Sequence, residues 1–226
     1  MTRVILGATS FAEAEASLAL ATALAVDAGA ELLGLMIDDA EVLALSSAHG
    51  AQIIAPGGQS VAPPPAADMR AALARDAARF QHGLQQAATR AALGWRFARL
   101  GGSLAGALAD LAEPGDLLVV AAGPLRSPIR DIVLLSAPQT PAAAPLRRAA
   151  DVAASHAARP LRVLAQPDTP PDTAPGLASG TDPALLAVLG RLGPGSVLFT
   201  QMAPDGAALV ALLRATRCTH VLCWTA

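Results

Sequence analysis

The chain has 226 residues, of which 53% are hydrophobic and 15% charged, and its formal net charge at pH 7 is −2. This composition is typical of a soluble globular protein with one large domain or two small ones. The weak negative charge and the few aromatic residues, 3% with no tyrosine, exclude a surface built to attract or stack nucleic acid. All 16 basic residues are arginines, which excludes a Schiff-base or P-loop lysine.

The cysteines and the apolar stretches indicate in which cellular compartment to expect the protein. Cys218 and Cys223 are five residues apart, and with 219–224 as a strand they lie too far apart for a disulfide. Free cysteines are usual in the cytoplasm, where we expect this protein. No signal peptide is evident, and Asp27 and Glu31 interrupt the apolar stretch 18–37, so we expect no membrane insertion.

The first half of the sequence predicts alternating strands and helices. Ser10 and Glu13 fit a capping box, Gly29 stops the helix that follows, Gly94 ends a long helix and Ser103 caps a short one. In chain order we expect a strand at 4–8, a helix at 11–28, a strand at 32–37, a loop at 49–65, a helix at 67–93, a strand at 95–100, a helix at 104–112 and a strand at 117–122.

The second half repeats this order of elements. Thr140 and Pro141 are a typical N-cap and first helical residue. We expect a strand at 132–135, a helix at 141–157, a strand at 161–165, a loop at 167–183, a short helix at 183–190, a strand at 197–200, a helix at 206–214 and a strand at 219–224. The strand at 132–135 could instead be the fifth strand of the first half.

The alternation of strands and helices predicts an α/β fold with parallel sheets and right-handed crossovers. The strands are continuously apolar, which indicates sheets covered by helices on both faces. We therefore predict two lobes, residues 1–125 and a truncated second lobe at 126–226, each with a parallel sheet flanked by helices.

The same order of elements resembles the universal stress protein family. The best local matches are RVILGATSFAEAEASLALATALAVDAGAELLGLMID, residues 3–38, and DIVLLSAPQTPAAAPLRRAADVAASHAARPLRVLAQ, residues 131–166. The resemblance implies a tandem pair of Rossmann-like domains of this family. It also implies five parallel strands per domain and pairing between copies through the last strand, giving a homodimer.

One branch of that family binds ATP, and the resemblance implies where its residues would stand. An acidic residue is expected at the end of strand one, where this chain has Ala8, and a glycine-rich phosphate loop after strand four, where it has Gly123 without a partner glycine. Pro124 and Pro128 each remove a backbone donor from that segment. It is either the joint between the halves or a degenerate phosphate site, and the missing glycines favour the joint.

Any small ligand is expected at the carboxyl ends of the first-half strands, where open α/β sheets bind ligands. Arg126 would be the cation for a phosphate. Ser10 either only caps its helix or also borders a ligand site. Asp38 either holds a ribose or a cation or is a loop carboxylate. The candidate ligand-binding residues are Gly7, Thr9, Ser10, Ile37, Asp38, Ala121, Gly123, Arg126 and Ser127.

These observations favour a non-catalytic module over an enzyme. The histidines are scattered without metal-ligand spacing, and no serine-hydrolase motif is present, so we expect no catalytic residues and no metal. We expect no cofactor, with ATP as the alternative, and a protein partner or a second copy of the chain rather than nucleic acid. The alternative function is a nucleotide-binding stress-response protein that uses a non-standard phosphate loop for ATP or AMP.

Overall fold

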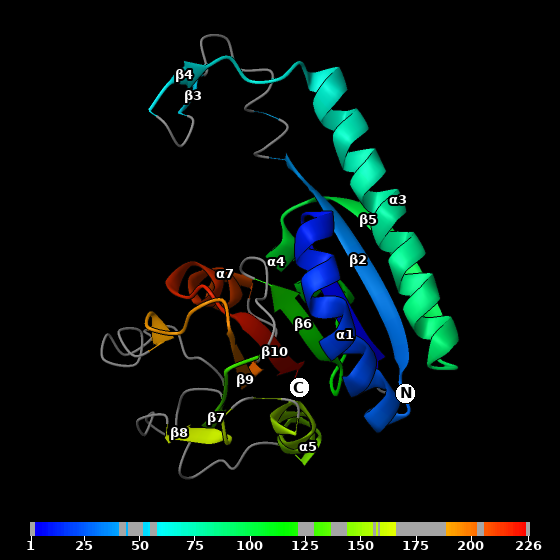
Figure 1. Ribbon diagram of the computed structural model, residues 1–226, viewed down its shortest axis with the longest axis vertical. Helices are drawn as coiled ribbons and strands as arrows, with labels where there is room; N and C mark the ends of the chain where they lie inside the picture. Colours follow the sequence, from blue (N-terminus) through cyan, green and yellow to red (C-terminus); the bar gives the residue numbers. More distant parts are fainter. Residues whose placement is uncertain are drawn as a thin grey trace.

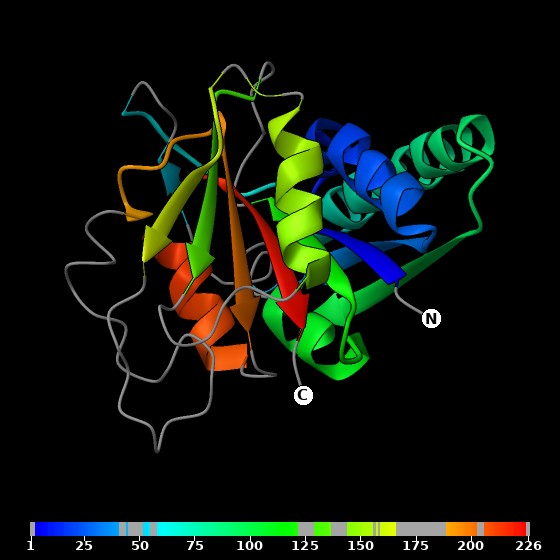
Figure 2. The same ribbon diagram turned by 90° about the horizontal axis from the view of Figure 1, so that it is seen from below.

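The fold is built on an eight-stranded mixed sheet with helices on both faces (Figures 1 and 2). The computed structural model describes residues 3–40, 44, 52–54, 58–121, 129–136, 144–155, 157, 159–165, 189–202 and 206–224. Its main strands are β1 (Arg3–Ala8), β2 (Glu31–Asp39), β5 (Trp95–Gly102), β6 (Leu117–Ala121), β7 (Asp131–Ser136), β8 (Arg162–Ala165), β9 (Ser196–Met202) and β10 (Thr219–Trp224). The described helices are α1 (Phe11–Ala28), α3 (Ala66–Arg90), α4 (Leu104–Leu111), α5 (Ala144–Ala154) and α7 (Gly206–Ala215).

The eight strands lie in the order β5-β2-β1-β6-β10-β9-β7-β8. The first four are parallel to one another, and so are the last four. β6 and β10 pair antiparallel, with Val119 opposite Val221, and join the two groups into one sheet. The predicted α/β class with a mostly parallel sheet is therefore confirmed.

The continuous sheet departs from the expectation that each half has a sheet of its own. The strand order also differs between the halves: β5 lies outside β2, whereas β9 lies between β7 and β10. β7 pairs with β8 and β9, so residues 132–135 belong with the second-half strands and not with the first. The tandem origin and the lobe boundary stay predictions, and the boundary at 125/126 falls outside the described residues.

Helices cover the two faces unequally. Figure 2 shows α1, α3 and α5 on one side of the sheet and α4 and α7 on the other. Successive strand residues point to opposite faces, so Leu32 and Met36 of β2 join the core under α1 and α3, while Leu33, Leu35 and Ile37 join the core under α4. Burial on both faces explains why the strands are apolar without alternation.

The ends of α1 and α4 follow the local sequence, whereas α3 and α5 end before the expected residues 93 and 157, α5 at Ala154. The Ser10 hydroxyl accepts a hydrogen bond from the Glu13 amide and begins α1, and Gly29 ends it with a φ of 58°. Ser103 caps α4 in the same way through the Gly106 amide. The long helix α3 was expected to continue to residue 93 but ends at Arg90, because Ala92 takes the left-handed conformation with a φ of 54°.

The predicted loops differ from the structure in one place. Short strands β3 (Ile53–Ile54) and β4 (Ser60–Val61) pair antiparallel inside the stretch 49–65, which was expected to be a loop. The second expected loop, 167–183, and most of the short helix after it lie outside the described residues.

We predict that Ala92→Gly stabilises the protein. A left-handed alanine is strained by about 1–2 kcal/mol, and part of that gain is offset because glycine adds freedom to the unfolded chain. The free energy of unfolding in urea should rise by roughly 0.5–1 kcal/mol. Ala91→Gly is the matched control, since Ala91 has a φ of −91° and glycine there should destabilise. Equal losses in both variants would contradict the prediction.

Candidate functional site

The structure brings together part of the predicted ligand site. Gly7 near the end of β1 pairs with Leu35 of β2 and with Val120 of β6, next to Ala121. Thr9 and Ser10 follow in the turn before α1. Gly123, Arg126 and Ser127 lie outside the described residues, so the phosphate-binding half of the prediction is not tested.

Carboxylates of this chain occupy the donors at the start of α1. Glu13 Oε2 accepts hydrogen bonds from the Thr9 amide at 3.0 Å and the Thr9 hydroxyl at 2.9 Å. Asp76 of α3 accepts from the Phe11 amide through Oδ2 at 3.2 Å, and Ser10 Oγ accepts from the Glu13 amide at 3.4 Å. The capping box is thus modified, because Glu13 reaches the Thr9 amide and not the Ser10 amide.

This arrangement has a direct electrostatic consequence. The N-terminus of a helix favours anions because its amide groups are unpaired and its dipole is positive there. Here Glu13 and Asp76 supply the negative charge that a bound phosphate would supply. A phosphate at the same place would have to displace these hydrogen bonds and approach two carboxylates.

Side chains fill the sheet face below the crevice. A Cβ atom on Gly7 would lie 3.0 Å from Leu104 Cδ1 and 3.5 Å from both δ carbons of Leu108, so α4 packs directly on the β1 backbone. Ala8 points to the opposite face and is fully buried in the core under α1. An acidic side chain at position 8 would therefore have no access to solvent on this backbone.

Asp38 is held by an ion pair. β2 extends to Asp39, so Asp38 is a strand residue and not the loop carboxylate that the sequence favoured. Arg99 of the neighbouring β5 grips both carboxylate oxygens, with Nη2 to Oδ2 at 2.8 Å and Nε to Oδ1 at 3.0 Å. Ile37 is buried under α4 and offers no polar group. Through this ion pair, Asp38 of β2 helps to hold the edge strand β5 against β2.

A buried polar group lies at the seam between β6 and β10, which the sequence did not identify. The His220 Nε2 atom lies 2.7 Å from Thr216 Oγ1, and that hydroxyl donates to the Leu212 carbonyl at 3.0 Å. Because the hydroxyl has one proton, Nε2 must carry the imidazole proton and donate to Thr216. His220 Nδ1 is then a buried acceptor without a hydrogen-bond partner.

Cys218 lies close to this histidine but is not an activated nucleophile. Its Sγ is 3.9 Å from His220 Nε2. Burial raises the pKa of Cys218 to about 11 and lowers the pKa of His220 to about 4, so both are neutral at pH 7. Neither side chain is more than 1% exposed. Across the described residues, no group of three or more histidine, cysteine or acidic side chains is placed to hold a metal ion.

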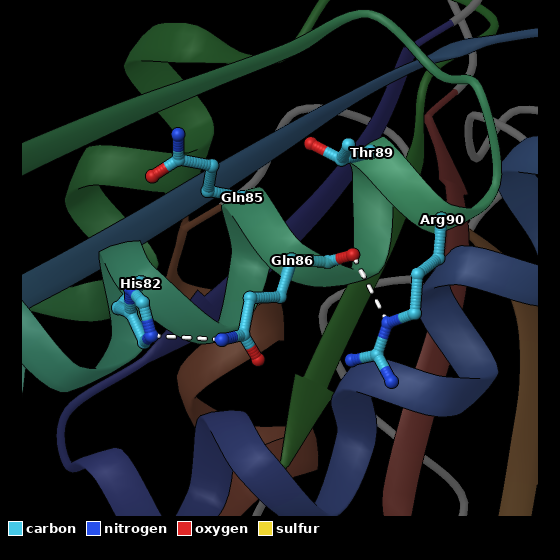
Figure 3. Close-up of a pocket in the computed structure, with 5 residues that line it drawn as sticks. All are labelled: His82, Gln85, Gln86, Thr89 and Arg90. Carbon is cyan, nitrogen blue, oxygen red and sulfur yellow. Dashed lines mark hydrogen bonds between the residues drawn. The ribbon is translucent and has the colours of Figure 1, made fainter.

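Two surface hollows lie away from the predicted crevice. One of about 610 Å³ sits at the opposite end of the first-half strands and includes Arg3, Glu31 and Arg96. Its two arginines are engaged, Arg3 with buried Asp116 at 2.6 Å and Arg96 with Glu31 at 2.9 Å. The other, of about 510 Å³, lies on α3 and is lined by His82, Gln85, Gln86, Thr89 and Arg90 (Figure 3).

Comparisons with known proteins leave the family open. No protein-family model matches the chain, and no curated protein matches it. Among solved structures, the universal stress protein UspA from Lactobacillus plantarum is similar over 72% of this chain and 97% of its own, with 18% sequence identity and a TM-score of 0.34. A likeness at this identity and TM-score does not establish a family, so membership of the universal stress protein family stays a prediction. Among the described helices, none is both long and apolar enough to cross a membrane.

We predict that His220 makes stability depend on pH. Its pKa is lowered from 6.5 to about 4 in the folded protein by burial, so the unfolded chain binds more protons between those values. The contribution to stability is therefore complete above about pH 6.5 and is lost as the pH falls towards 4, by up to about 3 kcal/mol.

The variant His220→Gln isolates this effect, because its amide can donate to Thr216 but does not titrate. Urea denaturation at neutral and acidic pH should show a smaller loss of stability for the variant than for the wild type. His82→Gln, at an exposed histidine of α3, is the control and should behave as the wild type. Parallel pH profiles for the wild type and His220→Gln would contradict the prediction.

Proposed function

We propose that this chain is a non-catalytic, universal-stress-protein-like module that acts through protein contacts and holds no nucleotide. The observation that carries the proposal is the occupied N-terminus of α1. At the turn between β1 and α1, one of the helix N-termini where an open α/β sheet can receive an anion, Glu13 and Asp76 take the backbone donors of Thr9 and Phe11.

Other contacts around the crevice support the same conclusion. Asp38, the candidate for a ribose, is held by Arg99. Leu104 and Leu108 pack against the Gly7 backbone where a ligand would need space. In the described part of the chain, the one cysteine–histidine pair in contact is buried and neutral, so no activated nucleophile supports an enzymatic role there.

The test is titration of the full chain with ATP and AMP, followed by calorimetry and by thermal unfolding. We expect no heat of binding and no rise in Tm at millimolar nucleotide. A ligand present at 100 times its Kd would stabilise the folded state by about 2.7 kcal/mol, which thermal unfolding detects readily.

The contrary result is also specific. Micromolar ATP affinity in the wild type that is lost in Arg126→Ala would show a phosphate site after β6 and would overturn the proposal. Arg130→Ala is the matched control, because Arg130 is an exposed arginine a few residues along the same connection and precedes β7.

A further inference from the structure

The long helix α3 buries one narrow stripe. Its buried residues are Ala77, Phe80, Leu84 and Ala88, which follow one another at spacings of three and four and so lie on one side of the helix. Phe80 packs edge-on against Phe97 of β5, with ring centroids 5.5 Å apart. The other residues of this helix of 25 residues are half-buried or exposed, and the exposed ones are available to solvent or to a partner.

A second stripe runs along the opposite side. It consists of Arg75, Arg79, His82, Gln86 and Arg90, all exposed. At 100° per residue these five positions fall within a sector of roughly 80°, almost diametrically opposite the buried stripe. Figure 3 shows three of them, His82, Gln86 and Arg90, following one another along the helix. We call this set the basic stripe.

The arginines of the basic stripe have no carboxylate partner among the described residues. Arg90 donates through Nε to the Gln86 carbonyl at 3.1 Å. Asp76, the acidic residue nearest to Arg75 and Arg79 in sequence, instead receives the Phe11 amide. By contrast, the exposed edge strand pairs its Arg96 with Glu31 and its Arg99 with Asp38. The basic stripe therefore presents unneutralised guanidinium groups on a protein whose net charge is −2.

The spacing of the stripe indicates the shape of its partner. Contacts repeated at spacings of three and four residues match a second helix that crosses at about 20°, as in antiparallel bundles and coiled coils. The hollow of about 510 Å³ between His82 and Arg90 adds amide and guanidinium donors, from Gln85, Gln86 and Arg90. Planar guanidinium groups pair best with carboxylates in two-point contacts.

A second copy of the chain does not supply the matching charges. Two carboxylates three or four residues apart occur in none of the described helices. These carry Glu13, Glu15 and Asp27 on α1, Asp68 and Asp76 on α3, and single acids on α4 and α5. Nucleic acid is disfavoured by the net negative charge and by the scarcity of aromatic residues.

We propose that the basic stripe of α3 docks an acidic helix of a partner protein, with glutamate or aspartate side chains spaced three and four residues apart. This inference rests on the proposed role in protein contacts and names the surface and the partner chemistry. Exposed ion pairs are individually weak and are screened by salt, so the complex is expected to dissociate as ionic strength rises.

The probe is a fluorescein-labelled helical peptide of roughly 20 residues with glutamates at that spacing. Its fluorescence anisotropy is measured against the full chain at low salt. The triple variant R75Q/R79Q/R90Q should bind about tenfold more weakly, which corresponds to the loss of three exposed ion pairs. The matched control R191Q/R214Q/R217Q removes the same charge from exposed arginines of the second half and should bind within about twofold of the wild type.

Three results would overturn the proposal. Equal losses in the two triple variants would mean that only net charge matters. A second peptide has the same composition but has its glutamates distributed around the helix. If it binds as tightly as the first peptide, the stripe does not discriminate between spacings of the glutamates. Binding of oligothymidylate that depends on the stripe, without binding of the acidic peptide, would assign the surface to nucleic acid.

Two further measurements keep the test clear. Circular dichroism and Tm establish that the triple variants are folded. ATP titration of the same samples separates the two proposals. If neither ATP nor the peptide binds, only the docking surface is contradicted. If ATP binds, the proposed function is contradicted, and the peptide result is judged independently.

Discussion

The antiparallel pairing of β6 with β10 is the contact on which the architecture depends. It joins two parallel groups of strands into one sheet and turns what would be two edges into an interior. The helices on one face then meet across the seam, where Arg148 of α5 grips Asp27 of α1 through both carboxylate oxygens. The same pairing seals His220 inside the protein, so its protonation and the integrity of the seam are linked.

At the carboxyl ends of the first-half strands, side chains of the chain itself occupy backbone donors that a ligand could use. A parallel α/β sheet presents unpaired helix amides at the carboxyl ends of its strands, and these must be satisfied by a ligand, water or the protein itself. At the start of α1, Asp76 of α3 accepts from the Phe11 amide, and Glu13 of α1 accepts from the Thr9 amide just before the helix. Under the proposed function the protein acts through contacts with other proteins, and the basic stripe of α3 is the surface to which we assign them.

Local features could be predicted from the sequence, and long-range ones could not. Ser10, Gly29 and Ser103 set helix ends through bonds to residues three or four positions away, and continuous apolar runs predicted the buried strands. Asp76 was missed because its partner Phe11 lies 65 residues away. The antiparallel seam was missed because apolar strands carry no pattern that specifies their neighbours or direction. Ala92 was missed because alanine rarely adopts a positive φ.

We propose that the protein acts through the exposed side of α3 and not through the carboxyl edge of the sheet. Backbone amide NMR of the isotope-labelled full chain tests both places in one sample, titrated first with ATP and then with the acidic helical peptide. We expect unchanged amide chemical shifts at Thr9, Ser10 and Glu13 with ATP, and chemical-shift changes concentrated between Arg75 and Arg90 with the peptide. Saturable chemical-shift changes at Thr9 and Glu13 with ATP, together with unchanged shifts on α3 with the peptide, would contradict this proposal.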